Sequence, residues 1–331
     1  MLPLMLLSLN LLPFDVYAMR GKGVTAVTGE TATCRILERD ENQKLQHQCS
    51  GTLTNEQTVL TAAHCLLHVL EEKLTISVEC GQESIDYAQA TFEFTSRGGK
   101  VMTGGVKFKE KRVAKELAIQ SDYDGYRKGD VGRLILDHAI KAVSPVPVAT
   151  KDEAIHVSKK IDEYNSSIPE TTCLSEGYGL NENEYSGILQ RMTPQELKLT
   201  PENIFNYWDY WFDTYNLVFE KEQLRQEIDC ANHSGELVDD LELSRRLKKL
   251  GLNHATLAFG DSGGPLYCGV GPDFDMKLMG IASGTSADPQ VFMFANWWTL
   301  PLDSTFVPLD EFIKHAPFVM LPREIDVQNK K

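Results

Sequence analysis

The sequence predicts an all-β fold for most of the chain. Between residues 31 and 150, short runs rich in β-branched and apolar residues alternate with turns. Residues 172–192 and 255–295 repeat this pattern with glycine-rich turns. Strands at this spacing favour a sandwich or a barrel over alternating strands and helices. The 331 residues are 42% hydrophobic and 24% charged, as is usual for globular domains.

The first half of the chain holds the clearest strands. We expect strands at residues 31–37, 74–80 and 131–136, the last closed by Asp137. Residues 142–149 alternate valine and proline. Because proline has no backbone N–H to donate, this run predicts an edge strand or an extended connection.

Residues 193–250 differ from the rest of the chain and predict a mostly helical insertion. The Thr-Pro-Glu run at 200–202 combines a capping threonine, a proline in the first turn and an acid, which is a typical helix start. Residues 241–250 also follow a helical pattern. A short amphipathic helix is expected at 308–315, near the C-terminus.

The N-terminus indicates secretion. Its apolar run, MLPLMLLSLNLLPF, is too short and too interrupted for a membrane span, which needs about 20 apolar residues. It resembles the apolar core of a secretion signal, and Val-Tyr-Ala at 16–18 offers a cleavage site. A buried apolar N-terminus is the alternative. We predict a signal peptide at 1–18, a short propeptide at 19–23, and a secreted protein, either extracellular or periplasmic.

Charge and cysteine content narrow the function classes. The formal net charge of -14 disfavours nucleic acid as a partner, because an acidic chain repels phosphate. No CxxC or HExxH motif occurs, so neither a metal nor another cofactor is predicted. Disulfides are the default in an oxidising compartment, and the odd count leaves one cysteine unpaired. The seven cysteines are Cys34, Cys49, Cys65, Cys80, Cys173, Cys230 and Cys268.

Two motifs carry the chemistry. The run GDSGGP at 260–265 sets Ser262 in a tight turn with an exposed hydroxyl, and its glycines let backbone N–H groups approach a substrate. A serine hydroxyl needs an adjacent base to become a nucleophile. The run LTAAHC at 60–65 offers His64 as that base, since histidine titrates near neutral pH.

Together these motifs resemble the trypsin-like serine proteases of the chymotrypsin fold. The resemblance extends from about residue 24 to residue 315, apart from the insertion, and predicts one peptidase domain at 24–320. It implies two six-stranded antiparallel barrels, with the insertion in the second barrel and a short helix at the C-terminus. It also implies a catalytic triad, in which an aspartate orients the histidine.

The resemblance identifies Asp130 as the acid of that triad. Asp130 precedes an apolar run at 131–136, as the family's aspartate does, although Gly132 and Arg133 depart from the pattern. The competing acids are Asp122, Asp124 and Asp137. By the same resemblance, the backbone N–H groups of Gly260 and Ser262 form an oxyanion hole.

The family's landmarks also imply the disulfides. Cys49 and Cys65 have the spacing of the family's histidine-loop bridge, Cys173 and Cys268 match a second bridge, and a third is expected between Cys34 and Cys80. Gly177-Tyr178-Gly179 resembles the family's Gly-Trp-Gly element. Cys230 would then be free.

Specificity and activation depart from the trypsin pattern. The residues that correspond to the substrate pocket are Thr256, Ser283 and Gln290, and threonine at the pocket base does not select Arg or Lys. In the family, Asp261 pairs with a new N-terminus created by cleavage. Here cleavage would follow Arg20, Lys22 or Gly23, or none is needed; a basic linker is the alternative.

The sequence therefore predicts a secreted serine endopeptidase that is not strictly specific for Arg or Lys. Its expected partners are protein or peptide substrates and protease inhibitors, with no stable membrane span. The rival hypothesis is a catalytically silent relative that acts as a binding module.

Overall fold

The structure is a computed structural model. It describes residues 24–69, 72–96, 98–121, 123, 130–150, 153, 173–181, 183–192, 214–218, 260–270, 275–285, 291–296 and 306–308. The predicted signal peptide and propeptide lie outside this part of the chain. Within the described segments we find no helix with the length and apolar character that a membrane crossing requires.

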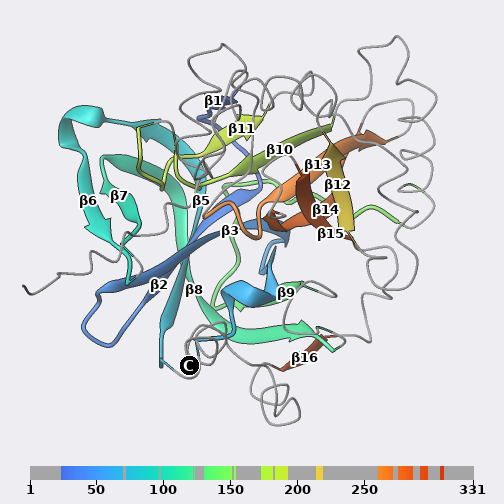
Figure 1. The fold of residues 1–331 in the computed structure, drawn as a ribbon, viewed down its shortest axis with the longest axis horizontal. Helices are drawn as coiled ribbons and strands as arrows, with labels where there is room; N and C mark the ends of the chain where they lie inside the picture. The colour runs from blue at the N-terminus through green and yellow to red at the C-terminus, as the bar shows by residue number, and fades with distance from the viewer. Residues whose placement is uncertain are drawn as a thin grey trace, which may run out of the picture.

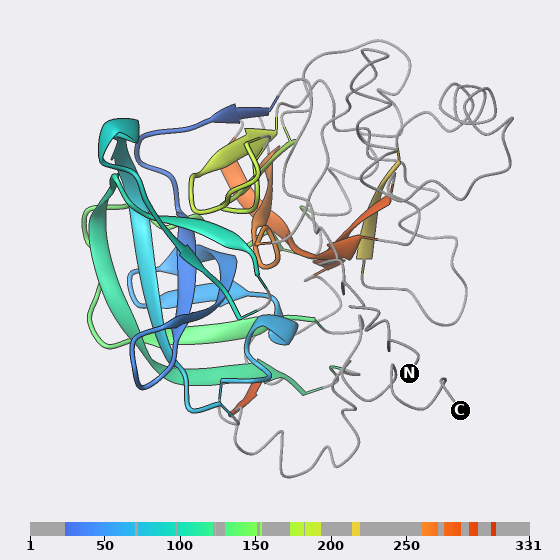
Figure 2. The same cartoon turned by 60° about the vertical axis from the view of Figure 1, so that its left-hand side comes forward.

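Six antiparallel strands of the first half close into a barrel (Figures 1 and 2). Their order is β8-β5-β2-β3-β4-β9, and β9 pairs back to β8. A short strand from the C-terminal region, β16 (Phe306–Pro308), pairs with the end of β8. The barrel strands are β2 (Thr33–Arg39), β3 (Leu45–Asn55), β4 (Thr58–Thr61), β5 (Thr75–Ile85), β8 (Val106–Gln120) and β9 (Gly132–Leu136).

The second half forms another antiparallel sheet, in the order β1-β11-β10-β13-β14-β15-β12. Its first strand, β1 (Val24–Ala26), comes from the start of the described chain and pairs with β11. The two sheets give the chymotrypsin-like all-β fold that the sequence predicts. The other strands are β10 (Cys173–Gly177), β11 (Gln190–Met192), β12 (Thr214–Val218), β13 (Pro265–Val270), β14 (Asp275–Thr285) and β15 (Val291–Asn296).

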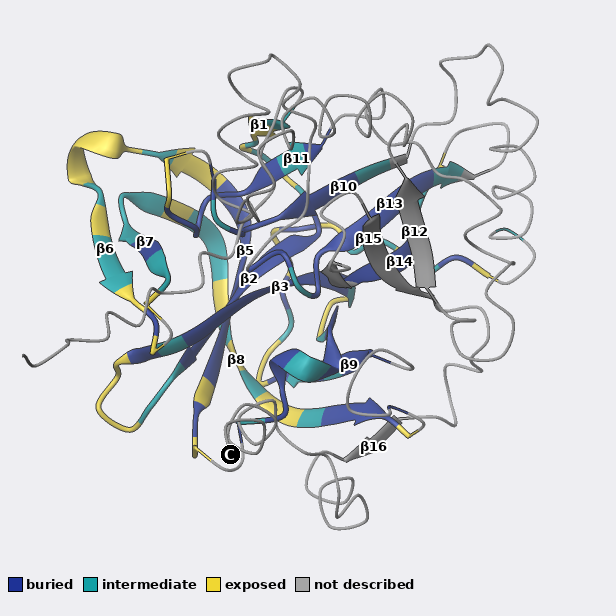
Figure 3. Ribbon diagram, viewed as in Figure 1, coloured by how far each residue is buried: buried dark blue, intermediate teal, exposed yellow. Residues whose placement is uncertain are grey.

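Three short elements lie outside the two large sheets. A two-stranded hairpin consists of β6 (Thr91–Phe94) and β7 (Lys100–Gly104) and has exposed positions along β6 (Figure 3). Two 3-10 turns complete the described elements, η1 (Ala63–Cys65) and η2 (Tyr87–Gln89). Of these, η1 matters most for function, because it carries His64.

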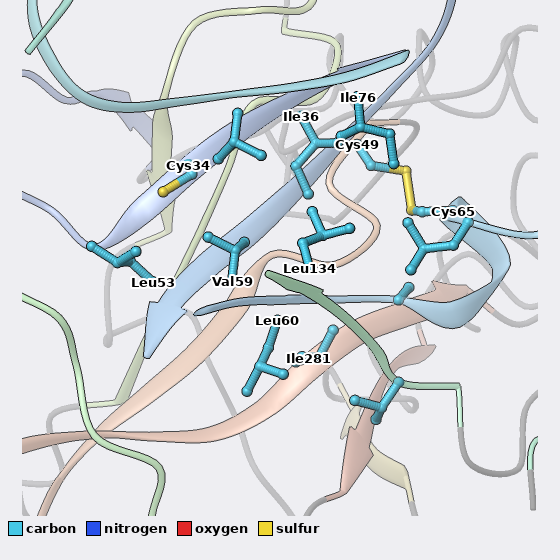
Figure 4. Packing of buried hydrophobic residues seen from close by; sticks show 14 of the residues in the cluster. Cys34, Ile36, Cys49, Leu53, Val59, Leu60, Cys65, Ile76, Leu134 and Ile281 are labelled. Atoms are coloured by element: carbon cyan, nitrogen blue, oxygen red, sulfur yellow. A yellow bond between two sulfur atoms is a disulfide. The ribbon is translucent and has the colours of Figure 1, made fainter. Parts of the chain in front are cut away.

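The hydrophobic core joins the two halves. Side chains such as Ile36, Val59 and Leu134 fill the first barrel and are fully buried (Figure 4). Leu278 and Ile281 of the second sheet belong to the same cluster. Because one continuous apolar cluster spans both sheets, burial holds the halves in a fixed relation.

A buried ion pair sits among the barrel strands. The guanidinium of Arg35 contacts Glu79 at 2.5 Å and also donates to the carbonyls of Met102 and Gly187. Burial alone raises the pKa of the Glu79 carboxyl, but Arg35 and Lys111 outweigh it and hold that pKa below its ordinary value. Arg35 therefore joins β2 to segments that are distant in the sequence.

The two expected helices fall mostly outside the described residues, and the few positions that are described there are strand. Within the predicted insertion the structure describes only Thr214–Val218, and these residues form β12 rather than helix. These residues form a strand because β12 pairs along its whole length with β15. Pro308, expected to begin the C-terminal helix, ends β16 instead. The rest of the insertion and residues 309–315 lie outside the described residues.

The predicted strands agree with the structure apart from their ends. Residues 142–149 form an extended connection whose single bridge joins Val148 to Leu278. Such a connection suits a run whose prolines cannot donate hydrogen bonds. β5 continues five residues past Cys80, because it pairs with the long β8.

Two predicted disulfides are present, Cys34–Cys80 and Cys49–Cys65. The first joins neighbouring strands β2 and β5, and the second joins β3 to η1. Cys268 is also disulfide-bonded, and its backbone pairs with that of its predicted partner Cys173 across β10 and β13. Cys230 lies outside the described residues.

Removing the Cys34–Cys80 bridge by double substitution to alanine is expected to lower the unfolding free energy by about 4 kcal/mol. The bridge closes a separation of 46 residues, which restricts the unfolded chain, and both cysteines are fully buried. Denaturant titration of the parent and of the double variant measures the loss. A loss below about 1 kcal/mol would contradict this expectation.

Candidate active site

The candidate base, His64, is fixed by its immediate sequence. It lies in η1 directly after β4, and the alanines that precede it, Ala62 and Ala63, are fully buried. Their small side chains let the turn lie close to the core. The Cys49–Cys65 disulfide then ties the turn to β3. The His64 side chain keeps 34% of its surface exposed, so a substrate can reach it.

Asp130 holds His64 by two hydrogen bonds. Its Oδ2 lies 2.7 Å from His64 Nδ1, and its Oδ1 accepts from the His64 backbone N–H at 2.9 Å. The Asp130 carboxylate is fully buried. A buried carboxylate on Nδ1 keeps the proton on that nitrogen and leaves Nε2 as an acceptor.

Among the competing acids, Asp137 is engaged elsewhere. It accepts from the backbone N–H groups of Val113 and His138 and is partly exposed. Asp122 and Asp124 lie outside the described residues. Of the described aspartates, Asp130 is therefore the one bonded to His64.

Ser262 is held next to this pair by backbone contacts. Its carbonyl accepts from the N–H of Ser50 at 2.8 Å, which anchors the serine turn to β3. The sulfur of Cys65 lies 3.9 Å from His64 Nε2 and 3.8 Å from the Ser262 backbone oxygen. The same sulfur therefore borders both residues. Ser262 is only partly buried.

The glycines of the serine turn are required by space. A Cβ on Gly263 would lie 2.1 Å from Thr61 Oγ1, and the residue has φ of +84°. A Cβ on Gly264 would lie 2.4 Å from the Glu176 carbonyl oxygen. Only glycine lets the turn approach β4 and β10 this closely.

The backbone N–H groups of the turn fall into two sets. Those of Gly263 and Gly264 donate to the carbonyls of Ala282 and Asp261. For those of Gly260 and Ser262, no acceptor is found within the described segments. The oxyanion hole at the N–H groups of Gly260 and Ser262 stays a prediction.

The Asp261 side chain points into the protein and is almost fully buried. Its Oδ1 accepts from the N–H of Gly179 at 2.8 Å. A Cβ on Gly177 or Gly179 would lie within 3 Å of this carboxylate. The two glycines of the Gly-Tyr-Gly element therefore leave the space that the Asp261 side chain occupies.

The predicted substrate pocket is described only in part. Ser283 lies in β14 at an irregularity of the pairing with β15, between Ala282 and Gly284. Thr256 and Gln290 lie outside the described residues. Their roles remain predictions.

Ser50 is a site residue that motif analysis missed. Its buried hydroxyl accepts from the Tyr178 N–H at 2.9 Å and donates to the Gly260 carbonyl at 2.7 Å. It thereby links β3, the Gly-Tyr-Gly element and the serine turn. The signal in the sequence is the position of Ser50 directly after Cys49. Motif analysis read that segment only as part of a disulfide motif.

Ser50→Ala is expected to lower kcat/KM for peptide substrates by about 10- to 100-fold. The buried Tyr178 N–H would lose its acceptor, at a cost of about 1–3 kcal/mol, and the Gly260 peptide would lose an anchor. Steady-state kinetics measures this. Ser96→Ala is the matched control, since the Ser96 hydroxyl donates to the Gln46 carbonyl at an exposed position. Equal kinetics for both variants would rule out an anchoring role.

A comparison with protein-family models identifies the family of the chain. The family model described as Trypsin matches residues 23–200, which include His64 and Asp130. A solved structure of HL collagenase is similar at 14% sequence identity, with a TM-score of 0.48, over 82% of this chain and 92% of that one. The family match covers more than half of the chain, and the chain therefore belongs to the trypsin family of serine proteases.

Proposed function

We propose that this protein is a secreted serine endopeptidase that cleaves peptide bonds through an acyl-enzyme on Ser262. The observation that carries the proposal is the 2.7 Å contact between the buried Asp130 carboxylate and His64 Nδ1, beside the serine turn. Membership of the trypsin family supports the same chemistry.

The proposed first step forms the acyl-enzyme. Ser262 Oγ attacks the substrate carbonyl carbon while its proton passes to His64 Nε2. The negative charge on the carbonyl oxygen is stabilised by the N–H groups of Gly260 and Ser262, each worth roughly 3 kcal/mol in the transition state. The C–N bond then breaks, and the leaving amine takes the proton from Nε2.

The second step regenerates the enzyme. Water attacks the acyl carbon and gives a proton to His64 Nε2, and the ester bond to Ser262 breaks as Oγ takes that proton back. Asp130 stays ionised throughout and stabilises the transient imidazolium. No cofactor takes part in either step.

Substrate choice and activation belong to the same proposal. Thr256, Ser283 and Gln290 are proposed to line a pocket without an acidic base, which disfavours strict cleavage after Arg or Lys. Asp261 is proposed to pair with a new N-terminus after cleavage near residues 20–23. Secretion is supported by the disulfides, which persist in oxidising compartments.

The test is reaction of the purified chain with a fluorophosphonate probe. Attack of Ser262 Oγ on phosphorus expels fluoride and leaves a stable adduct, so mass spectrometry should locate one label on the peptide that contains Ser262. The His64→Ala variant should not be labelled at a comparable rate. Determination of the N-terminus on the same sample distinguishes an unprocessed form from a silent relative. A processed chain that stays unlabelled would overturn the proposal.

A further inference from the structure

A second cluster of reactive side chains lies apart from the triad. Glu38 of β2 and His47 of β3 are direct partners in the antiparallel pairing and therefore lie on the same face of the sheet. His68, in the segment after η1, joins them. One ligand atom from each of the three side chains lies within 4.8 Å of the others.

A fourth group borders the cluster. Glu72 Oε2 lies 3.8 Å from His47 Nε2, and the Glu72 backbone N–H donates to the His68 carbonyl. The rings of His47 and His68 lie beside each other, with centroids 4.3 Å apart. Two imidazoles and two carboxylates thus come from three separate segments of the chain.

Burial holds two of these side chains in place. Glu38 is fully buried and His47 is 8% exposed. Side chains whose rotamers are fixed by packing lose little conformational freedom when they bind an ion. The donor atoms of the cluster are therefore preorganised for binding.

The donor set selects the kind of cation. Two imidazole nitrogens and two carboxylate oxygens are ligands typical of Zn²⁺, whereas Ca²⁺ and Mg²⁺ prefer oxygen alone. In a tetrahedral zinc site the ligand atoms lie roughly 3.4 Å apart, given bonds of about 2.0–2.1 Å. The spacing here is somewhat wider, so small side-chain rotations would close it.

We propose that Glu38, His47 and His68, with Glu72 as the fourth ligand, form a binding site for a divalent transition metal ion of the Zn²⁺ type. His47 is two residues before Cys49, and His68 is three residues after Cys65. Through His47 and His68, the metal would therefore join the same two segments as the Cys49–Cys65 disulfide, and Glu38 would add β2. It would act as a second cross-link behind the turn that carries His64.

The experiment uses the full chain with Ser262→Ala, which prevents self-cleavage during long titrations. Calorimetric titration with ZnCl₂ should show one ion per chain. Zinc at about 100 times its Kd should raise Tm by roughly 5 °C, and a chelator should reverse the rise. Cobalt(II) in place of zinc should give the intense visible absorption of a four-coordinate site.

Variants show whether this cluster is the site. His68→Ala and Glu38→Gln should each abolish the Tm rise and the cobalt spectrum. His138→Ala is the matched control, because His138 is 80% exposed and pairs with Asp137 away from the cluster. Metal-free His68→Ala should unfold like its parent, which separates lost binding from lost folding. Absence of saturable binding, or binding that survives His68→Ala, would overturn the proposal.

Discussion

Ser262→Ala is expected to lower kcat for peptide cleavage by about 10⁶-fold. The hydroxyl of Ser262 is the proposed nucleophile, and alanine has no atom that can form the acyl-enzyme. The residual rate would come from substrate binding and from the N–H groups of Gly260 and Ser262, which the substitution leaves in place. The turn itself should persist, because Ser262 is held through its backbone carbonyl by Ser50.

The measurement is cleavage of a peptide library by parent and variant, purified in parallel. The cleavage sites of the parent would also show the preference of the pocket proposed at Thr256, Ser283 and Gln290. An equal unfolding midpoint for both proteins would show that the variant loses activity because the nucleophile is missing and not because the fold is weakened. If the parent cleaves peptides and Ser262→Ala cleaves them equally fast, Ser262 is not the nucleophile.

Asp130→Asn is expected to lower kcat about 10⁴-fold with little change in stability. Asparagine has nearly the same shape, and its oxygen can still accept from the His64 backbone N–H, as Asp130 Oδ1 does. Its amide N–H₂ would face His64 Nδ1, which must then act as an acceptor. The proton moves to Nε2, and His64 can no longer accept the proton of Ser262.

Asp137→Asn is the matched control for this prediction. Asp137 was a competing candidate, but its carboxylate is bonded to Val113 and His138. We expect its kcat to stay within about twofold of the parent, because it touches neither His64 nor Ser262. A larger loss from Asp137→Asn than from Asp130→Asn would refute the assignment. Asp122→Asn and Asp124→Asn complete the comparison.

The strands could be predicted from the sequence because β-branched and apolar residues favour half-buried, extended backbone. The runs at 31–37, 74–80 and 131–136 all lie in the first barrel, with ends that shift by a few residues. The end of a strand depends on the length of the strand that it pairs with, and local sequence does not identify that partner. For example, β5 extends to Ile85 because it pairs with β8.

Residues 214–218 show where local sequence does not determine secondary structure. Residues 214–218 have a composition compatible with helix or strand, and the helix start at 200–202 favoured helix. The ladder with β15, about 80 residues away in the sequence, makes them a strand. Hydrogen bonds across such a separation outweigh propensities of a few tenths of a kcal/mol per residue.

The sequence by itself determined the fold class and the family resemblance, and it predicted Ser262 and His64 as candidate catalytic residues, since motifs such as GDSGGP encode tight local turns. Only the tertiary structure decided which acid meets His64, because Asp130 and His64 are separated by 66 residues. It alone showed Ser50 bridging the serine turn, and it alone brought Glu38, His47 and His68 together. Such contacts depend on strand register and barrel closure, which are properties of the whole chain rather than of any motif.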